Sequence, residues 1–583
     1  MTTPSSLDAK RHSLSHLLAA AVLEFWPQAK PTLGPPVDNG FYYDFDFPIT
    51  VSDNDLLKIE AKMIDLLKTW DTFTHSEVTA QKAKAEFKNN EYKHELIDGI
   101  AADGGKITIY QSGQFRDLCR GGHVEHMKEI QPGSWKLDRL AGAYWRGDEH
   151  NKMLTRIYGL AFDTKKELDE YLKQREEAAK RDHRKLGRQL GLFTFSELVG
   201  SGLPLYTPKG ALIRRLLNEY VEELQSKVGY TQVWTPQIAR AELFKISGHY
   251  DKYHDSMFRV VSNYSQEEMF LKPMNCPQHT QIYASEQRSY RDLPLRFSDF
   301  AMLYRDEKPG ELSGLARVRA FSQDDCHIFC RADQVDEEID QVLTMTKEVM
   351  KTFGFSYRYR LSTHDPEHPE KYIGDPATWN KLEKWAERII KRNKINYFDG
   401  PGEAAFYGPK MDLMATDALG REWQLSTVQI DFFLPERFKL TYIDRAGVEK
   451  RPVMIHRAIL GSPERFLMVL IEHLAGAFPT WLAPVQVKVL PVGASHHEFC
   501  GKLSAELRDH KIRAEVDDAN ETIGNKIRKA EHEKVPYSLV IGDKEIASGQ
   551  LAVRRRGHKE LANLPRAEFI TQLEQEIKGR RAS

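Results

Sequence analysis

Apolar residues recur at helical spacing near the start of the chain. In HSLSHLLAAAVLEFW, residues 12–26, leucines and a valine lie three and four positions apart, which predicts a helix. Turn-forming residues follow, and then the aromatic side chains of FYYDFDF, residues 41–47, indicate a strand. We therefore expect an α+β domain over residues 1–172.

A strongly charged segment follows this domain. KQREEAAKRDHRKLGRQLGLF, residues 173–193, has few apolar positions and is typical of a solvated helix. We expect it to be a helical linker between domains.

The middle of the chain alternates between the two periodicities. ALIRRLLNEYVEELQ has helical spacing, whereas KMDLMAT and STVQIDFFL have the composition of strands. This mixture predicts an antiparallel sheet flanked by helices over residues 194–483.

The last hundred residues have a more regular order. Strand-like VQVKVLPV, RAEVD and YSLVIG alternate with helical EFCGKLSAELRDH and TIGNKIRKAEHE. Such alternation predicts a small α/β domain with a mainly parallel sheet over residues 484–583. The whole chain is thus expected to be a multidomain protein of mixed α/β and α+β class.

Composition agrees with several folded domains. The 583 residues exceed what one hydrophobic core supports, and 41% hydrophobic with 29% charged residues is ordinary for globular chains. The formal charge of −1 neither requires nor excludes a nucleic-acid partner, so any such binding must use local patches.

Cysteine usage and hydropathy bear on location. Five scattered cysteines argue against a disulfide framework and indicate a reducing compartment. No secretory signal is visible at the amino terminus. The most apolar stretch, residues 466–485, contains Glu472 and His473 and is broken by Pro479, so we expect a buried helix and no membrane partner. The expected location is the cytoplasm.

Arginines in the middle domain suggest chemistry with phosphates. Arg305 and Glu307 end a strand-like run, a glycine-containing loop follows, and Arg319 opens the next strand. Guanidinium groups at the mouth of such a hairpin can clamp phosphates in bidentate fashion, while a carboxylate accepts from an adenine amino group. These residues alone would also fit a surface hairpin with ion pairs.

Three separated segments together carry a family resemblance. GYTQVWTP ends at Pro236, the Arg305 hairpin follows, and HRAILGSPERF carries Arg465 at a helix start. This order resembles motifs 1, 2 and 3 of the class II aminoacyl-tRNA synthetases. KPMNCPQH, RDLPLRFSDF, RVRAFSQDDCHIFC, AFYGPK, STVQIDF and VMIHRAILGS resemble the threonyl-tRNA synthetases more closely, and this similarity extends along nearly the whole chain.

The resemblance implies an ATP site and an activity. The implied reaction activates threonine with ATP and Mg²⁺ and transfers it to tRNA(Thr). The implied ATP-binding residues are Arg305, Glu307, Arg319, Gln424 and Arg465. Arg305, Arg319, Arg465 and Lys410 are the implied catalytic residues. Motif 1 implies a homodimer whose interface includes the Pro236 region.

The resemblance also implies one zinc ion per subunit, although no short ligand motif announces it. The implied ligands are Cys276, His327 and His456. Three protein ligands leave Zn²⁺ an open position, and in this family threonine supplies its amino group and hydroxyl to the metal. Valine lacks the hydroxyl, and a site built around a polar group rejects such an analogue by about 10⁴ or more.

Further residues of the threonine pocket follow from the same resemblance. They are Gln323, Asp325, Tyr407, Lys410 and Gln429. Cys326 stands where the family has a small residue such as Ala; we do not expect it to bind metal.

The first domain carries a second constellation. His12 and His16 share a helical face, and DLCRGGH contributes Cys119 and His123. On chemistry alone these four residues would also suit zinc. They resemble the HxxxH and CxxxH elements of threonyl- and alanyl-tRNA synthetase editing domains.

This likeness implies hydrolysis of mischarged seryl-tRNA(Thr) without a required metal. Lys93 and Asp117 match further residues of the editing cleft. Gly122 departs from the family, where Pro is expected, which puts the placement of His123 in question. The amino-terminal ubiquitin-like domain usual in the family is expected to be absent.

The carboxyl-terminal segment resembles the anticodon-binding domain of several class II synthetases. The implied base contacts are Asn520, Lys534, Glu545 and Arg554, with Glu545 and Arg554 expected on adjacent strands. Hydrogen-bonding side chains of this kind read the edges of unpaired bases in RNA loops. Ordinary strand polarity would also explain them.

Three other classes of protein fit the sequence less well. A prolyl- or seryl-type synthetase is disfavoured by Cys276, His327 and His456. A non-catalytic RNA-binding regulator would have no need of Arg305 or Arg465. A free-standing editing protein would lack the middle domain.

Overall fold

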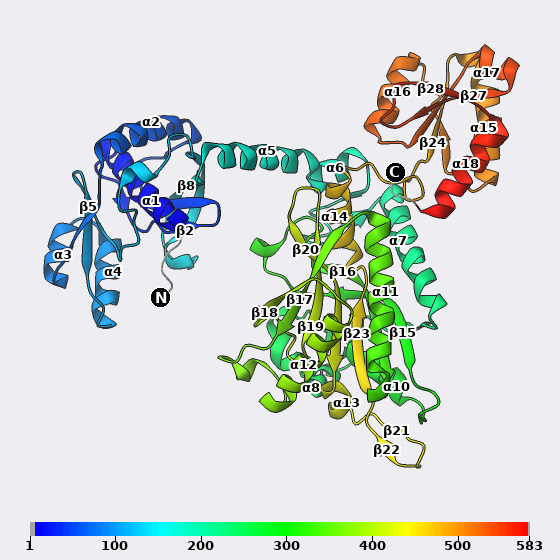
Figure 1. Cartoon of the computed structure of the whole chain (residues 1–583), viewed down its shortest axis with the longest axis horizontal. Helices are drawn as coiled ribbons and strands as arrows, with labels where there is room; N and C mark the ends of the chain where they lie inside the picture. Colours follow the sequence, from blue (N-terminus) through cyan, green and yellow to red (C-terminus); the bar gives the residue numbers. More distant parts are fainter. Residues whose placement is uncertain (1–5, 581–583) are drawn as a thin grey trace. The chain divides into compact units, whose positions relative to one another are not determined.

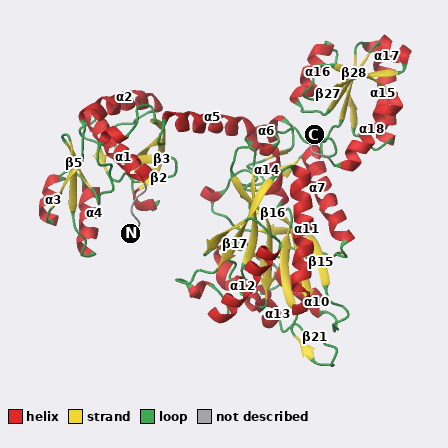
Figure 2. Cartoon of the chain, in the orientation of Figure 1, coloured by secondary structure: helices red, strands yellow, loops and turns green. Residues whose placement is uncertain are grey.

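The computed structural model describes residues 6–580, which form two compact units (Figure 1). The first unit ends at Glu176, and the second begins at Glu177. Both combine helices with sheets (Figure 2). Each contains its own buried hydrophobic clusters.

A five-stranded sheet forms the larger part of the first unit. Its order is β1-β3-β8-β7, with β2 beside β3. The bounds are β1 Lys30–Pro31, β2 Pro36–Val37, β3 Gly40–Asp46, β7 Trp135–Tyr144 and β8 Met153–Ala161. Helix α1 (Ser6–Phe25) packs on β3, and α2 (Asp53–Thr69) packs on α1 and β7. The helix predicted after His12 and the strand predicted at 41–47 are confirmed.

A smaller sheet completes this unit. It consists of β4 (Thr74–Glu77), β5 (Thr108–Ser112) and β6 (Phe115–Leu118). Helices α3 (Ala80–Glu86) and α4 (Glu91–Ala102) pack on each other beside it around Ala83 and Ile97.

The charged segment contains two helices with different surroundings. In α5 (Lys165–Arg181) only Leu168 is buried, as expected for a solvated helix. In α6 (His183–Gln189), by contrast, His183 and Leu186 are buried against α14. The expectation of a solvated linker up to residue 193 was therefore wrong for its second half, because a few apolar side chains among the charges join the core.

An eight-stranded sheet is the centre of the second unit, in the order β11-β15-β16-β23-β20-β19-β17-β18. The bounds are β11 Thr231–Gln232, β15 Leu295–Tyr304, β16 Ala320–Cys330, β23 Val453–Ala458, β20 Glu422–Asp431, β19 Lys410–Thr416, β17 Ser356–Thr363 and β18 Tyr397–Pro401. Its pairings are antiparallel except at the two edges, where β11–β15 and β17–β18 are parallel. The predicted antiparallel sheet is confirmed.

Helices cover one face of this sheet. They are α7 (Pro208–Lys227), α11 (Val335–Phe353) and α14 (Pro463–His473), and their apolar side chains share one buried cluster with the strands. Helix α12 (Pro376–Arg392) packs on β17, and α10 (Cys276–Ala284) packs on β16. Short elements surround this sheet: β9 Phe193–Thr194, β10 Leu205–Tyr206, β12 Ile238–Arg240, α8 Ala241–Ser247, α9 His249–Tyr253, β13 Arg259–Val260, β14 Met269–Leu271, α13 Phe433–Arg437, β21 Tyr442–Ile443 and β22 Glu449–Lys450.

A further five-stranded sheet, in the order β25-β24-β26-β27-β28, lies near the carboxyl terminus of the second unit. The bounds are β24 Val487–Pro491, β25 Ala514–Val516, β26 Tyr537–Ile541, β27 Gln550–Arg555 and β28 Leu561–Pro565. The helices are α15 His497–Asp509, α16 Ile523–His532, α17 Asp543–Ser548 and α18 Arg566–Gly579. Only the pairings of β24 are parallel, since β27 and β28 add as antiparallel strands. The mainly parallel sheet we expected is thus a mixed one.

Within residues 6–580, none of the helices has the length and apolar character needed to traverse a lipid bilayer.

Candidate functional site

A row of polar residues crosses the large sheet. His327 on β16 stands opposite His456 on β23, which stands opposite Gln429 on β20, which stands opposite Lys410 on β19. Residues paired in register project from the same face of a sheet. This row therefore lies on one face.

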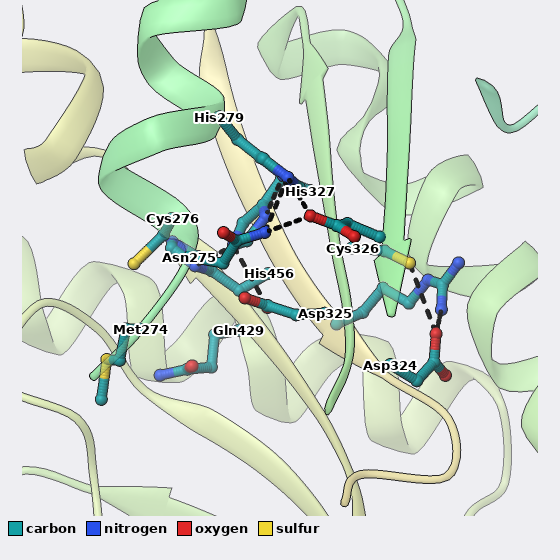
Figure 3. A network of polar contacts seen from close by, with 12 residues as sticks. Met274, Asn275, Cys276, His279, Asp324, Asp325, Cys326, His327, Gln429 and His456 are labelled. Atoms are coloured by element: carbon teal, nitrogen blue, oxygen red, sulfur yellow. Dashed lines mark hydrogen bonds and ion pairs between the residues drawn. The ribbon is translucent and has the colours of Figure 1, made fainter. Parts of the chain in front are cut away.

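Side-chain alternation along β16 adds to that face and defines the other. Gln323 and Asp325 project with His327, because positions two apart share a face. Asp324 and Cys326 project to the opposite side, where Asp324 accepts from the Arg457 guanidinium at 3.0 Å. The Cys326 thiol lies 3.4 Å from Asp324 and is fully buried, so it packs on the side away from the histidine row (Figure 3).

Cys276 brings a thiol to the histidines. It begins α10, which packs on β16, and its Sγ, a ring nitrogen of His327 and one of His456 all lie within 4.8 Å of one another. His327 Nε2 and His456 Nδ1 are 3.0 Å apart. The three residues, remote in sequence, thus form one buried cluster (Figure 3).

The partners of the two rings suit metal coordination. His456 Nε2 lies 2.9 Å from the Asp431 carboxylate, which can accept its proton and leave the Nδ1 lone pair directed into the cluster. His327 Nδ1 lies 2.8 Å from His279, which leaves its Nε2 facing His456. Metal-binding histidines ordinarily have their second nitrogen held in this way. One thiol and two imidazoles are a ligand set that Zn²⁺ accepts.

An unsatisfied amide lies beside this cluster. Gln429 Nε2 is buried and has no hydrogen-bond partner among the described residues, although its Oε1 accepts from the Tyr407 hydroxyl at 3.4 Å. A buried donor without a partner is costly, so this atom fits a polar ligand. Lys410 lies nearby in the row, with its ammonium 3.3 Å from Asp412.

A second pocket, with a cavity of about 210 Å³, lies farther along the same strands. Its lining includes Arg305 and Glu307 after β15, Gln424 on β20 and Arg465 in the first turn of α14. Gln323 lines it too. Gln323 and His327 are four residues apart on β16, so about 13 Å of strand separates the pocket from the Cys276 cluster.

Two arginines of the hairpin differ in placement. Arg317 lines the pocket and forms an ion pair with Glu307 at 2.7 Å. Arg319 is not among the described lining residues; its guanidinium donates to the Glu307 carbonyl oxygen at 2.9 and 3.0 Å. Of the two arginines in the RVR segment, the resemblance implied Arg319, whereas Arg317 lines the pocket.

The pocket concentrates positive charge. Burial lowers the pKa of Arg465, and the neighbouring guanidinium groups of Arg305 and Arg317 lower it further, with only Glu307 acting in the other direction. Like charges held together in a cavity favour a polyanionic ligand.

The first unit contains its own cavity of about 550 Å³. His12 and His16 from α1 and Cys119 line it, and their ligand atoms, with that of His123, lie within 4.8 Å of one another. The Cys119 sulfur is 3.5 Å from His12 Nε2 and 3.3 Å from His123 Nε2. The pair His12 and His16 and the pair Cys119 and His123, far apart in sequence, therefore meet in one cluster.

A buried ion pair forms the floor of this cavity. Lys93 from α4 pairs with Asp117 from β6, and both side chains are almost completely buried. The Tyr43 hydroxyl donates to the same carboxylate. Sequence analysis missed Tyr43; its only signal was a place in the aromatic strand 41–47, which reads equally well as core.

Burial keeps the imidazoles and the thiol of this cavity neutral. It lowers the pKa of His12, and that of His16 well below its usual value. It also lowers the pKa of His123, and it raises the pKa of Cys119 to about 12. His16 Nδ1 is buried 3.7 Å from the Asp117 carboxylate, and it has no hydrogen-bond partner among residues 6–580.

The loop before His123 follows a left-handed path. Gly121 and Gly122 have φ of 90° and 89°, a region that favours glycine and that proline is barred from adopting. The expected Pro at 122 would require another loop conformation. With Gly122, the His123 ring stacks on Phe73 with ring centroids 3.9 Å apart.

The four residues expected to contact the anticodon divide between two regions. Asn520 follows β25 and Glu545 follows β26, so both lie at the edge where these parallel strands end. Lys534 lies past the far end of α16, about 15 Å along that helix from Asn520. Arg554 stands opposite Ser538, near the start of β26, and donates to Glu531 at 2.5 Å.

Glu545 also requires a correction. We expected it on a strand, but it lies in the first turn of α17, where its carboxylate accepts from the Gly542 amide at 2.9 Å. This capping bond stabilises the helix start, and the composition of IGDKEIA did not reveal it.

Three family models match separate parts of the chain. Residues 258–474 match the tRNA synthetase class II core domain of the G, H, P, S and T type. Residues 486–576 match the anticodon binding domain. Residues 107–158 match the threonyl and alanyl tRNA synthetase second additional domain.

Individual relatives extend the likeness over the full chain. A threonine–tRNA ligase of Gloeobacter violaceus is 48% identical, over 99% of this chain and 93% of its own. One of Rubrobacter xylanophilus is 47% identical, over 99% and 90%. Among solved structures, the RNA binding domain of threonyl-tRNA synthetase from Cryptosporidium parvum is 36% identical with a TM-score of 0.65, covering 68% of this chain and 98% of its own.

A prolyl-tRNA synthetase from Giardia lamblia, at 17% identity over 70% of this chain and 81% of its own, has a TM-score of 0.56 and shares the fold alone. The two ligases above have a much higher sequence identity to this chain and cover more of it. The match to the catalytic core domain excludes a free-standing editing protein. The chain belongs to the threonine–tRNA ligase family, with a class II catalytic core, an anticodon-binding domain and an editing domain.

Proposed function

We propose that the pocket of Arg305, Arg317 and Arg465 binds ATP with Mg²⁺ as a substrate, and that threonine is activated beside it. The observation that carries this proposal is the convergence of three guanidinium groups, that of Arg465 partly buried, in a cavity on the same sheet face as the Cys276 cluster. The arginines neutralise phosphate charge, and charge that develops on the transferred phosphate is stabilised by the same groups.

The remaining polar groups of this pocket are assigned by chemistry. Glu307, fixed by Arg317, accepts from the adenine amino group, and Gln424 hydrogen-bonds to the nucleotide. Arg319 contributes indirectly to ATP binding, since it hydrogen-bonds to the Glu307 backbone carbonyl.

Cys276, His327 and His456 would hold one Zn²⁺ per chain. When bound, the metal supplies an electrophilic position for the amino group and hydroxyl of threonine. Asp325, next to the cluster, orients the amino group, and Gln429 offers its unpaired amide to the substrate. Lys410 and Tyr407, with Gln323, complete the pocket. Valine would leave the hydroxyl position unfilled.

Serine keeps that hydroxyl and differs by one methyl group, which is worth about 1–3 kcal/mol of discrimination. We assign its removal from tRNA(Thr) to the cavity of the first unit. The neutral imidazoles of His12, His16 and His123 can position a water molecule, and the Lys93 ammonium can stabilise negative charge at the ester carbonyl. The neutral Cys119 thiol serves as a hydrogen-bonding group.

The tRNA(Thr) anticodon is assigned to the carboxyl-terminal domain. Asn520 and Glu545, at one edge of its sheet, form one contact region. Lys534 and Arg554 form a second, so the RNA loop would have to span both.

A homodimer through motif 1 is proposed from exposed apolar groups near Pro236. Trp234 is 73% exposed, and Ile238 lies nearby at 42%. Large apolar side chains exposed together favour an interface. Sedimentation at micromolar concentration should give a dimer, and Trp234→Glu should shift it to monomer; an active wild-type monomer would refute the assignment.

The zinc assignment is tested by metal analysis of purified enzyme with a chelation series. We expect about one zinc per chain, loss of threonine-dependent ATP–pyrophosphate exchange on chelation, and recovery with added Zn²⁺. Active enzyme that contains no metal would show the pocket assignment to be wrong.

A further inference from the structure

A buried histidine of helix α6 contacts a loop of the proposed ATP pocket, which we call the nucleotide pocket. The His183 side chain is 6% exposed, and its Nε2 accepts a hydrogen bond from the Leu315 amide at 3.1 Å. Leu315 belongs to the turn between Glu307 and Arg319, and it lines the pocket together with Ala316 and Arg317. The connection therefore joins a helix outside the pocket to the backbone of its wall.

The ring is fixed by a carboxylate on its other side. Glu472 at the end of α14 accepts from the His183 backbone amide at 3.0 Å and lies 2.7 Å from Nδ1. Because an ionised carboxylate only accepts, the proton of the neutral ring resides on Nδ1, and Nε2 presents a lone pair to the Leu315 N–H. One side chain thus determines both the orientation and the tautomer of the ring.

The second oxygen of Glu472 contacts the residue that precedes strand β20. It accepts from the Arg421 guanidinium at 2.5 Å, and Arg421 also pairs with Asp417 in the turn between β19 and β20. Strand β20 begins at Glu422 and carries Gln424 into the pocket. The same carboxylate is therefore linked through His183 to the motif 2 turn and through Arg421 to the start of β20.

The turn packs closely against His183 at Gly314. A Cβ on Gly314 would lie 2.1 Å from His183 Nε2, and Gly314 has a φ of +49°. On the other side of the turn, Arg465 donates to the Ala316 carbonyl at 3.2 Å. The backbones of two successive residues are thus anchored, one by His183 and one by a proposed phosphate-binding arginine.

We propose that His183, oriented by Glu472, is a positioning residue for ATP: it holds the Leu315–Arg317 turn so that Arg317 and Arg465 meet the nucleotide in one geometry. This inference rests on the proposed ATP site. Loss of the Nε2 acceptor leaves the buried Leu315 amide unsatisfied and releases the turn. The ATP site is weakened, while the Cys276 cluster on the other part of the face is unaffected.

Two substitutions separate this role from simple packing. In His183→Asn the side-chain amide can still donate to Glu472, but nothing reaches the Leu315 amide. In His183→Gln the longer side chain places an acceptor near the former Nε2. The KM for ATP should rise about tenfold or more in His183→Asn and less in His183→Gln. The KM for threonine and the zinc content should stay at wild-type values in both.

A matched control exists in the same unit. His364 has its backbone amide and Nδ1 bonded to a single oxygen of Glu383, at 2.8 and 2.7 Å, in the arrangement of His183 and Glu472. It is not among the lining residues of the nucleotide pocket. His364→Asn should therefore leave the KM for ATP unchanged, even if it lowers the melting temperature as much as His183→Asn does.

Amide hydrogen exchange at Leu315 gives a reading that needs no catalysis. The amide should be protected in the wild type and in His183→Gln, and it should exchange at least about tenfold faster in His183→Asn. An unchanged exchange rate, a KM for ATP within twofold of wild type, or an equal rise in the KM for threonine would overturn the proposal. If the wild type shows no threonine-dependent ATP reaction at all, the proposed ATP site fails, and the exchange result still decides whether His183 holds the turn.

Discussion

The Lys93–Asp117 ion pair gives the sharpest test of how the first unit is built. Lys93→Met removes the ammonium and keeps most of the side-chain length. The side chains of Lys93 and Asp117 are 1% and 3% exposed, so the change leaves a carboxylate buried without its cation. Breaking a buried pair costs about 3–5 kcal/mol.

The surroundings of Asp117 select the lower part of that range. Its carboxylate still accepts from the Tyr43 hydroxyl and from the Leu118 amide at 2.8 Å. We therefore expect a loss of about 3 kcal/mol in the free energy of unfolding of the first unit. In a unit of this size, each 1 kcal/mol shifts Tm by about 2–4 °C, so its transition should fall by roughly 6–12 °C.

Calorimetry of the full chain measures this, with Lys68→Ala as the control. Lys68 pairs with Asp65 at 3.0 Å, but both side chains are about 70% exposed, so its loss should leave the transition nearly unchanged. Deacylation of seryl-tRNA(Thr) should also fail in Lys93→Met, while threonine-dependent pyrophosphate exchange persists. Equal shifts in the two variants would refute the reasoning.

Three further changes test the other assignments. Cys276→Ala should remove zinc from the purified enzyme and abolish threonine activation, because water is a poor substitute for the thiolate; metal analysis that finds full zinc occupancy would contradict this. Arg465→Ala should slow adenylate formation by about 10²-fold or more while threonine binding is little changed; single-turnover rates and threonine titrations separate the two, and an unaltered rate would remove the role. The double change His16→Ala with Cys119→Ala should leave threonylation nearly intact but allow seryl-tRNA(Thr) to persist; clearance as fast as in wild type would place editing elsewhere.

Local pattern predicted much of the architecture. The i, i+4 spacing of His12 and His16 was sufficient to place both rings on one helical face, and strand composition was sufficient for the antiparallel sheet. The Cys276, His327 and His456 cluster was not accessible in this way. Its members meet only because β16 and β23 pair in one register and α10 starts beside them, so family resemblance was the only guide.

The differences between expectation and structure have physical causes as well. Arg317 and Arg319 stand two apart in a turn, and only the path of the backbone decides that one faces the cavity and the other holds Glu307. In the charged linker, His183 and Leu186 are buried by a partner helix almost 300 residues later, which no local window contains. Glu545 was assigned to a strand because the sequence does not show its capping bond to Gly542. That bond depends on the backbone geometry of the helix start.

An amino-acid-dependent ATP–pyrophosphate exchange panel tests the central claim most directly. With zinc-loaded enzyme, threonine should support the fastest exchange. Serine should be activated roughly 10- to 200-fold less efficiently, since it lacks only a methyl group, and valine should be indistinguishable from the reaction without amino acid. Faster exchange with proline, valine or any other amino acid than with threonine would contradict the account.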